Sequence, residues 1–138
     1  MESVNLDKFR EILIAHEGWR NFPYEDTVGV TTIGVGRNLE SNGLSNDEVE
    51  YLLQNDIKRV LGECESFSYW DALSDRRKLV VASLVFQLGI RRFRGFVKTN
   101  AALEAQDYSL AAREMLDSKW ARQVPRRARE LSDWMMEG

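Results

Sequence analysis

The fold of this chain is decided by two runs of sequence, His16-Glu17-Gly18 and Asp26-Thr27-Val28-Gly29-Val30-Thr31-Thr32-Ile33-Gly34-Val35-Gly36-Arg37. A helical pattern of apolar residues begins at Leu6, where Asn5 can cap it, and ends at the glycine of the first run. In the second run β-branched residues alternate with glycines, which predicts short strands and tight turns between Tyr24 and Leu39. The two runs therefore predict a helix followed by a small sheet.

The rest of the chain has helical patterns. Ser45-Asn46-Asp47-Glu48 is a capping box, and the apolar stripe that follows it predicts a long helix ended by Gly62. Ser74 is a candidate cap for a second helix, which has apolar residues on all sides and is expected to be buried and to end at Gly89. Further helical segments are predicted at Arg91–Arg94, at Phe96–Gln106, at Ser109–Met115 and from Pro125 onward.

These elements together predict an α+β fold in a chain of 138 residues, a length that suits one domain. We expect a small β-containing lobe at residues 17–57. A larger helical lobe is expected to comprise residues 1–16 and 58–138, with the long helix joining the two lobes.

Two carboxyl side chains in this region suggest a chemistry. Glu17 is placed at a helix C-terminal end, where unpaired carbonyl groups favour the protonated form of a carboxyl group, as a general acid requires. Asp26 would supply a second carboxyl, and paired carboxyl groups hydrolyse glycosidic bonds. Glu17 could instead be an ordinary solvated glutamate. Asp26 could be a turn aspartate that accepts hydrogen bonds from its own backbone, and such an aspartate could still be catalytic.

The order and spacing of these residues match a known family. The chain resembles the bacteriophage lysozymes, or endolysins, of glycoside hydrolase family 24, through Glu17, Tyr24, Asp26, Gly29, Thr32, Ile33, Gly34 and Gly36. The similarity continues through Val85–Gly89, Gly95-Phe96 and Ser118–Trp120, and so spans nearly the whole chain.

The resemblance implies a lysozyme-like fold, in which the first helix packs on the helical lobe. It also implies a muramidase that cleaves the β-1,4 bond between N-acetylmuramic acid and N-acetylglucosamine in peptidoglycan, without a cofactor. Glu17 would be the general acid, Asp26 would stabilise the oxocarbenium-like transition state and orient water, and Thr32 would hold that water. This arrangement favours inversion, which needs carboxyl groups roughly 6.5–9.5 Å apart rather than about 5 Å.

Further positions match residues that face the saccharide in relatives. The candidate substrate-binding residues are Phe86, Gln87, Thr99, Asn38 and Gln123, and Glu114 aligns with another such position. Phe86 could equally belong to the core, and Asn38 and Glu114 differ in type from the residues expected there. Arg37 also departs from the family, which commonly has histidine after Gly-x-Gly, and we expect Arg37 to pair with Asp56.

Composition bears on location and partners. The net charge is −3, with 4 basic and 11 acidic side chains in residues 1–56 against 15 and 11 in residues 57–138.

Cys64 is the only cysteine, so no intrachain disulfide is expected, and neither a signal peptide nor a membrane-spanning segment is predicted. The resemblance therefore implies a protein of the host cytoplasm that reaches the wall in the periplasm once a separate phage-coded holin opens the inner membrane. We expect a monomer.

Other functions stay open at this point. A lytic transglycosylase would also use one acidic residue, and a wall-binding module would use none. The basic clusters Arg91–Lys98 and Arg122–Arg129 could contact wall anions but read more simply as solvated helical faces. No nucleic-acid recognition motif accompanies them, and one His with one Cys gives no metal-ligand set.

Overall fold

A computed structural model describes residues 4–138, and within it the chain divides into two compact units. The first unit extends to Tyr51 and the second begins at Leu52, so the division falls inside helix α3 (Asn46–Cys64). Each unit is described by itself. The helices and the small antiparallel sheet confirm the predicted α+β class. None of the helices in residues 4–138 combines the length and the apolar character needed to cross a membrane.

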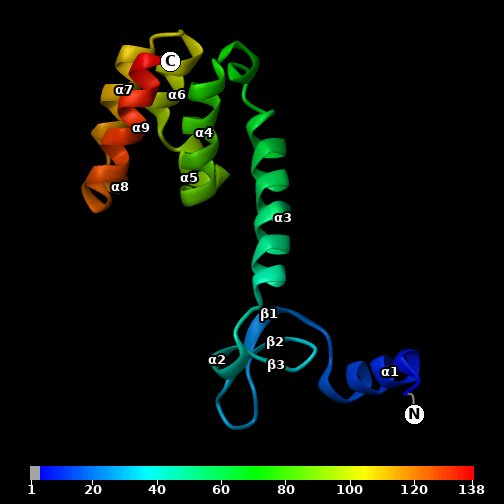
Figure 1. The fold of residues 1–138 in the computed structure, drawn as a ribbon. Helices are drawn as coiled ribbons and strands as arrows, with labels where there is room; N and C mark the ends of the chain where they lie inside the picture. The colour runs from blue at the N-terminus through cyan, green and yellow to red at the C-terminus, as the bar shows by residue number, and fades with distance from the viewer. Residues whose placement is uncertain (1–3) are drawn as a thin grey trace. The chain divides into compact units, whose positions relative to one another are not determined.

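The first unit contains the sheet (Figure 1). Its elements before α3 are α1 (Leu6–Glu17), β1 (Arg20–Glu25), β2 (Thr31–Gly34), β3 (Arg37–Asn38) and α2 (Leu39–Asn42).

Both ends of α1 are fixed by local hydrogen bonds that the sequence predicted. The side chain of Asn5 accepts a hydrogen bond from the Lys8 amide at 3.0 Å, which caps the first turn. At the other end Gly18 has a φ of 82° and its amide donates to the Ile14 carbonyl at 2.9 Å. Glu17 is therefore the last helical residue, as predicted.

The three strands form one antiparallel sheet in the order β1-β2-β3. Tyr24 lies opposite Thr32, and Thr32 lies opposite Asn38, so Thr32 occupies the middle of the sheet. The predicted bounds were wrong in two places. The sheet starts earlier, at Arg20, and Leu39 opens α2 because the Asn38 side chain caps that helix by accepting from the Ser41 amide at 3.0 Å.

The capping box at the start of α3 is confirmed. The Glu48 amide donates to the Ser45 hydroxyl at 3.2 Å, and the Ser45 amide donates to the Glu48 carboxylate at 2.8 Å. The predicted end of this helix was wrong, because α3 continues through Gly62 to Cys64. A glycine inside a helix costs only about 1 kcal/mol, and burial of the completely enclosed Cys64 side chain outweighs that cost.

The second unit is helical. After α3 it contains η1 (Trp70–Ala72), α4 (Asp75–Leu88), α5 (Ile90–Arg94), α6 (Val97–Glu104), α7 (Tyr108–Leu116), α8 (Lys119–Gln123) and α9 (Pro125–Glu137). The caps at Ser74 and Gly89 and the start at Pro125 are confirmed. Helix α8 was not predicted; it begins where the Ser118 hydroxyl accepts from the Ala121 amide at 3.1 Å.

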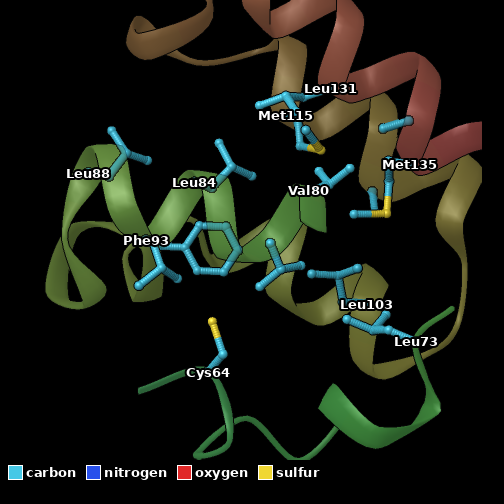
Figure 2. Close-up of a cluster of buried hydrophobic side chains, with 14 of the residues drawn as sticks. Cys64, Leu73, Val80, Leu84, Leu88, Phe93, Leu103, Met115, Leu131 and Met135 are labelled. Carbon is cyan, nitrogen blue, oxygen red and sulfur yellow. The ribbon is translucent and has the colours of Figure 1, made fainter. Parts of the chain in front are cut away.

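One apolar core holds the second unit together. Helix α7 packs on α6 and α9, and α4 packs on α5 and α9. Figure 2 shows the ring of Phe93, which is 0% exposed, among side chains of these helices and close to the thiol of Cys64. Burial raises the pKa of that thiol to about 11, so it stays neutral. Helix α4 is not buried on all sides, as had been expected, because Leu79 and Phe86 are exposed.

Candidate active site

Glu17 projects from the last position of α1, and its side chain is exposed. A Cβ atom built on Gly36 would lie 2.7 Å from Glu17 Oε2 and 3.0 Å from its Cγ, so the glutamate side chain rests directly on that glycine. Gly36 belongs to the turn between β2 and β3 and has a φ of 65°. The absence of a side chain at residue 36 therefore makes room for the Glu17 carboxyl group.

This role of Gly36 was not predicted. The sequence analysis assigned the glycines of this region to backbone bending, and the positive φ of Gly36 agrees with that assignment. The Gly-x-Gly pattern was the available signal, but only the fold shows that the second glycine, and not the first, meets Glu17.

Asp26 is fixed by its own turn. Its Oδ1 accepts hydrogen bonds from the amides of Val28 and Val30, each at 2.9 Å, and its own amide donates to the Val30 carbonyl at 2.9 Å. The turn interpretation of Asp26 is thus confirmed. Within residues 4–138, no hydrogen bond is formed to the second carboxylate oxygen, Oδ2, so that atom can accept a hydrogen bond from a ligand or a water molecule.

Thr32 lies in β2 and is 4% exposed. Its hydroxyl group donates a hydrogen bond to the Val30 carbonyl at 2.9 Å. The hydroxyl proton is therefore committed to the backbone, and the oxygen keeps its lone pairs as acceptors. The Val30 amide donates to the Asp26 carboxylate and the Val30 carbonyl accepts from the Thr32 hydroxyl. The backbone of one residue therefore sets the positions of these two side chains relative to each other.

The expected ion pair between Arg37 and Asp56 is wrong. Arg37 instead binds Glu48 through two hydrogen bonds of 2.8 and 2.7 Å, and it also donates to the Gly43 carbonyl at 3.0 Å. Asp56 pairs with Arg59 on its own helix at 2.8 Å. Glu48 is the nearer partner because the capping box already turns its carboxylate back toward the start of α3.

The Arg37–Glu48 pair joins β3 to the first turn of α3 within the first unit. The hydrogen bond from Arg37, followed by that from the Ser45 backbone, lowers the pKa of Glu48 to about 2, and the same pairing raises the pKa of Arg37. The carboxylate of Glu48 is therefore ionised at all pH values where the protein would work.

The candidate substrate-binding residues are distributed over several elements. In the first unit the Asn38 side chain caps α2, so its amide oxygen is already used. In the second unit Phe86 is 46% exposed rather than enclosed in the core, and it lines an apolar groove of about 410 Å³ between α3 and α4. Gln87 lines the same groove, and its amide oxygen accepts from Trp120 Nε1 at 3.2 Å and from Arg127 at 3.0 Å.

The remaining candidates lie elsewhere in the second unit. Thr99 is buried in α6 and, with Glu114, lines a separate cavity of about 350 Å³. Gln123 is exposed at the end of α8. The described part of the chain brings no three His, Cys, Asp or Glu side chains together in a group that could hold a metal ion.

Comparison with known proteins extends this description. The profile of the phage lysozyme family matches residues 14–132, which is most of the chain. The chain is 25% identical to the probable T4-type lysozyme 2 of Dictyostelium discoideum over 89% of its own length and 90% of that protein. It is 28% identical to the SAR-endolysin of Escherichia phage Mu, over 94% of the chain and 80% of that protein. It is also 25% identical to the pre-baseplate central spike protein Gp5 of Enterobacteria phage T4, over 93% of the chain but only 27% of that protein.

Proposed function

The chain belongs to the phage lysozyme family, which supports a peptidoglycan-lytic enzyme, and from this premise we propose that it is a muramidase. The bond cleaved is the β-1,4 linkage between N-acetylmuramic acid and N-acetylglucosamine. The single observation that carries this proposal is the exposed Glu17 carboxyl group resting on Gly36, in the same unit as the turn-fixed carboxylate of Asp26.

Glu17 is proposed as the general acid. It protonates the bridging oxygen as the bond to the anomeric carbon breaks, so the leaving sugar departs as an alcohol. The position of Glu17 supports this role, because Gly36 leaves room for its carboxyl group beside the turn between β2 and β3.

Asp26 and Thr32 are proposed to act on water. A water molecule that donates one hydrogen bond to Asp26 Oδ2 and the other to Thr32 Oγ1 keeps a lone pair free for attack on the anomeric carbon. The two amide hydrogen bonds on Asp26 Oδ1 and the hydroxyl donation from Thr32 to Val30 support this arrangement, because they aim two acceptors while leaving their lone pairs available. As this water attacks the face opposite to the leaving group, it gives its proton to the Asp26 carboxylate, and the anomeric configuration is inverted.

The carbohydrate is proposed to contact Phe86, Gln87, Thr99, Asn38 and Gln123. The half-exposed ring of Phe86 supports such a contact, since an accessible aromatic face suits a sugar ring. Gln87 has its amide oxygen held by Trp120 and Arg127, which orients its NH₂ group as a donor. Asn38 has the weakest support, because its side-chain oxygen caps α2.

The decisive experiment replaces Glu17 with glutamine, which keeps the size and removes the acid. Clearing of a purified cell-wall suspension should fall by about 10²–10⁴-fold, with the circular dichroism spectrum and Tm unchanged. Glu25→Gln is the matched control, since Glu25 is an exposed glutamate in β1 of the same unit, and it should retain activity. Clearing by Glu17→Gln at the wild-type rate would remove Glu17 from the role of acid.

The products test the reaction type. Hydrolysis gives reducing muramic acid ends, and mass spectrometry should detect these ends on every new fragment. Products with 1,6-anhydro ends would show a lytic transglycosylase instead. Proton NMR early in the reaction should detect the α-anomer if Asp26 directs water to the opposite face.

The proposal extends to the place of action. A phage lysozyme made in the host cytoplasm acts on the wall from the periplasm, and we propose that this chain works there as a monomer after a separate holin has opened the inner membrane. The similarity to a phage endolysin supports action on the cell wall. Lysis of cells that express this chain without any holin would contradict the dependence on a holin.

A further inference from the structure

The second unit carries a concentration of basic side chains where α8 leads into α9 (Figure 1). From Ser118 to Arg129 the chain has five basic residues and no acidic one. All five side chains are exposed, and together they form what we call the basic corner: Lys119, Arg122, Arg126, Arg127 and Arg129.

Packing of the two helices turns these side chains outward. Trp120 and Ala121 of α8 are buried, and so is Ala128 of α9. The indole Nε1 of Trp120 also donates a hydrogen bond to the Gln87 side chain at 3.2 Å, which ties α8 to the end of α4. Because the apolar faces of α8 and α9 are used in the core, the basic side chains lie on the faces that meet solvent.

The charge of the basic corner is not neutralised inside the protein. Within residues 4–138, none of its five side chains forms an ion pair, and Arg127 donates only to the uncharged Gln87 oxygen at 3.0 Å. Two carboxylates, Glu130 and Asp133, line shallow hollows of about 410 and 480 Å³ beside Arg126. Neither carboxylate pairs with an arginine of the described chain, so five positive charges face two negative ones and the excess is open to an external anion.

The side chains beside the arginines indicate the chemical class of that anion. No aromatic side chain lines the two hollows, so the bases of a nucleic acid would have nothing to stack on. Apolar groups are present instead: Val124 and Pro125 line the first hollow, and Leu116, three residues before Lys119, is 43% exposed. Basic side chains next to exposed apolar ones suit the surface of a lipid bilayer, where phosphate headgroups lie above hydrocarbon.

We propose that the basic corner docks the chain on an anionic phospholipid bilayer. Each guanidinium group can bind the oxygens of a lipid phosphate through two parallel hydrogen bonds. A basic side chain close to an anionic bilayer strengthens binding by about fivefold, and the effect is additive over a small cluster.

The uneven distribution of charge along the chain restricts docking to the second unit. Residues 1–56 have 4 basic and 11 acidic side chains, so an anionic surface repels that part of the chain. The basic corner therefore selects which unit meets the bilayer, although the net charge of the whole chain is −3. Attraction of this kind weakens as the salt concentration rises.

The test measures co-sedimentation of the full chain with lipid vesicles. One set of vesicles contains phosphatidylcholine alone, and the other contains equal amounts of phosphatidylcholine and phosphatidylglycerol. We expect at least about tenfold tighter binding to the anionic vesicles at low salt, and release of the chain at about 0.5 M salt. Equal binding to both sets of vesicles, or no binding to either, would overturn the proposal.

A double variant connects the binding to the basic corner. Arg126→Gln with Arg129→Gln removes two exposed charges and leaves Arg127 on Gln87, so the fold should persist, which circular dichroism checks. Its binding to anionic vesicles should be about tenfold or more weaker.

Lys8→Gln with Arg10→Gln is the matched control. It removes the same charge from exposed positions of α1 in the first unit and should bind the vesicles like the wild type. Equal weakening in the two double variants would show that net charge, and not the basic corner, governs binding, and would overturn the proposal.

Competition separates a bilayer from other phosphate-bearing partners. Single-stranded DNA and purified wall teichoic acid are added to the chain on anionic vesicles, and neither should displace it at an equal concentration of phosphate. Displacement by either polymer would assign the basic corner to a phosphate polymer and overturn the lipid assignment. Glu17→Gln should bind the vesicles like the wild type, so docking and glycan cleavage can each fail without the other.

Discussion

The two units of this chain are stabilised in different ways. Among the described residues up to Tyr51, Thr32 is the only one that is buried, whereas the second unit encloses apolar side chains from Val60 to Met135. The first unit is defined by local hydrogen bonds: the caps of α1 and α2, the Asp26 turn and the Arg37–Glu48 pair. The second is defined by apolar packing around Phe93 (Figure 2).

This difference corresponds to a difference in proposed role. A general acid must be reached by its substrate, and Glu17 lies at an exposed helix end where a glycine, rather than a packed side chain, leaves room for its carboxyl group. Interior packing instead fixes α8 and α9 of the second unit, which carry the arginines of the basic corner. Three pairs of substitutions test whether the comparison holds.

The largest effect is expected from the buried Phe93 of the second unit, with the exposed Phe22 of the first unit as its counterpart. Phe93→Ala should lower the free energy of unfolding by about 3–5 kcal/mol, because it removes an enclosed ring that packs edge-on against Phe67 at 5.6 Å between centroids. Phe22→Ala removes a ring that is 81% exposed in β1 and should change the same quantity by less than about 0.5 kcal/mol. Denaturant unfolding of the two variants checks this contrast. Equal losses would mean that packing matters equally in both units.

An intermediate effect is expected from the glycines of the β2–β3 turn. Gly36→Ala should reduce the rate of wall clearing by about tenfold or more, because the new methyl group displaces the Glu17 carboxyl group from its position. Backbone strain at positive φ should also cost about 1–2 kcal/mol of stability.

Gly34→Ala separates these two effects. Gly34 has a φ of 69°, close to the 65° of Gly36, but a Cβ atom there would meet nothing within 4 Å. Its stability loss should match that of Gly36→Ala while its activity, corrected for the folded fraction, stays near wild type. The idea that Gly36 positions Glu17 would be wrong if both variants lost activity to the same extent.

The smallest effect is expected from the exposed ion pair. Arg37→Ala should lower Tm slightly at neutral pH, because Glu48 loses its partner. The pKa of Glu48 is lowered to about 2 in the folded chain, from a usual value near 4.5, so its contribution is present above the usual value and is lost as pH falls toward 2. The Tm difference between wild type and Arg37→Ala should therefore shrink over that range.

Asp56→Asn is the control for this pair, since Asp56 binds Arg59 and not Arg37. It should leave the Tm difference caused by Arg37→Ala unchanged when the two substitutions are combined. If the change in Tm caused by one substitution depended on the other, Arg37 and Asp56 would interact, contrary to the structure.

Prediction from sequence succeeded where the structure depends on neighbouring residues. Asn5, Ser45 and Ser74 cap the helices that follow them, and Gly18 and Gly89 end helices, because each uses a hydrogen bond or a φ angle available within one turn. The turn at Asp26 was also correctly predicted, since its carboxylate binds amides two and four residues onward.

Prediction failed where a distant contact decided between local alternatives. Gly62 was expected to end α3, but burial of Cys64 carries the helix further. Arg37 was assigned to Asp56 by resemblance, whereas the capping box places the Glu48 carboxylate within its reach. Phe86 has an apolar side chain on an apolar helix, and only the packing of the second unit shows that its ring is half exposed.

The sequence by itself determined the α+β class, the family and the identity of the two proposed catalytic carboxyl groups, because these follow from residue order and from interactions that close within a few residues. The tertiary structure alone decided that Glu17 rests on Gly36, that Arg37 binds Glu48, and that Arg127 binds Gln87. Each of these contacts joins residues at least 11 positions apart, and the folded backbone, not the spacing along the chain, sets which of them meet.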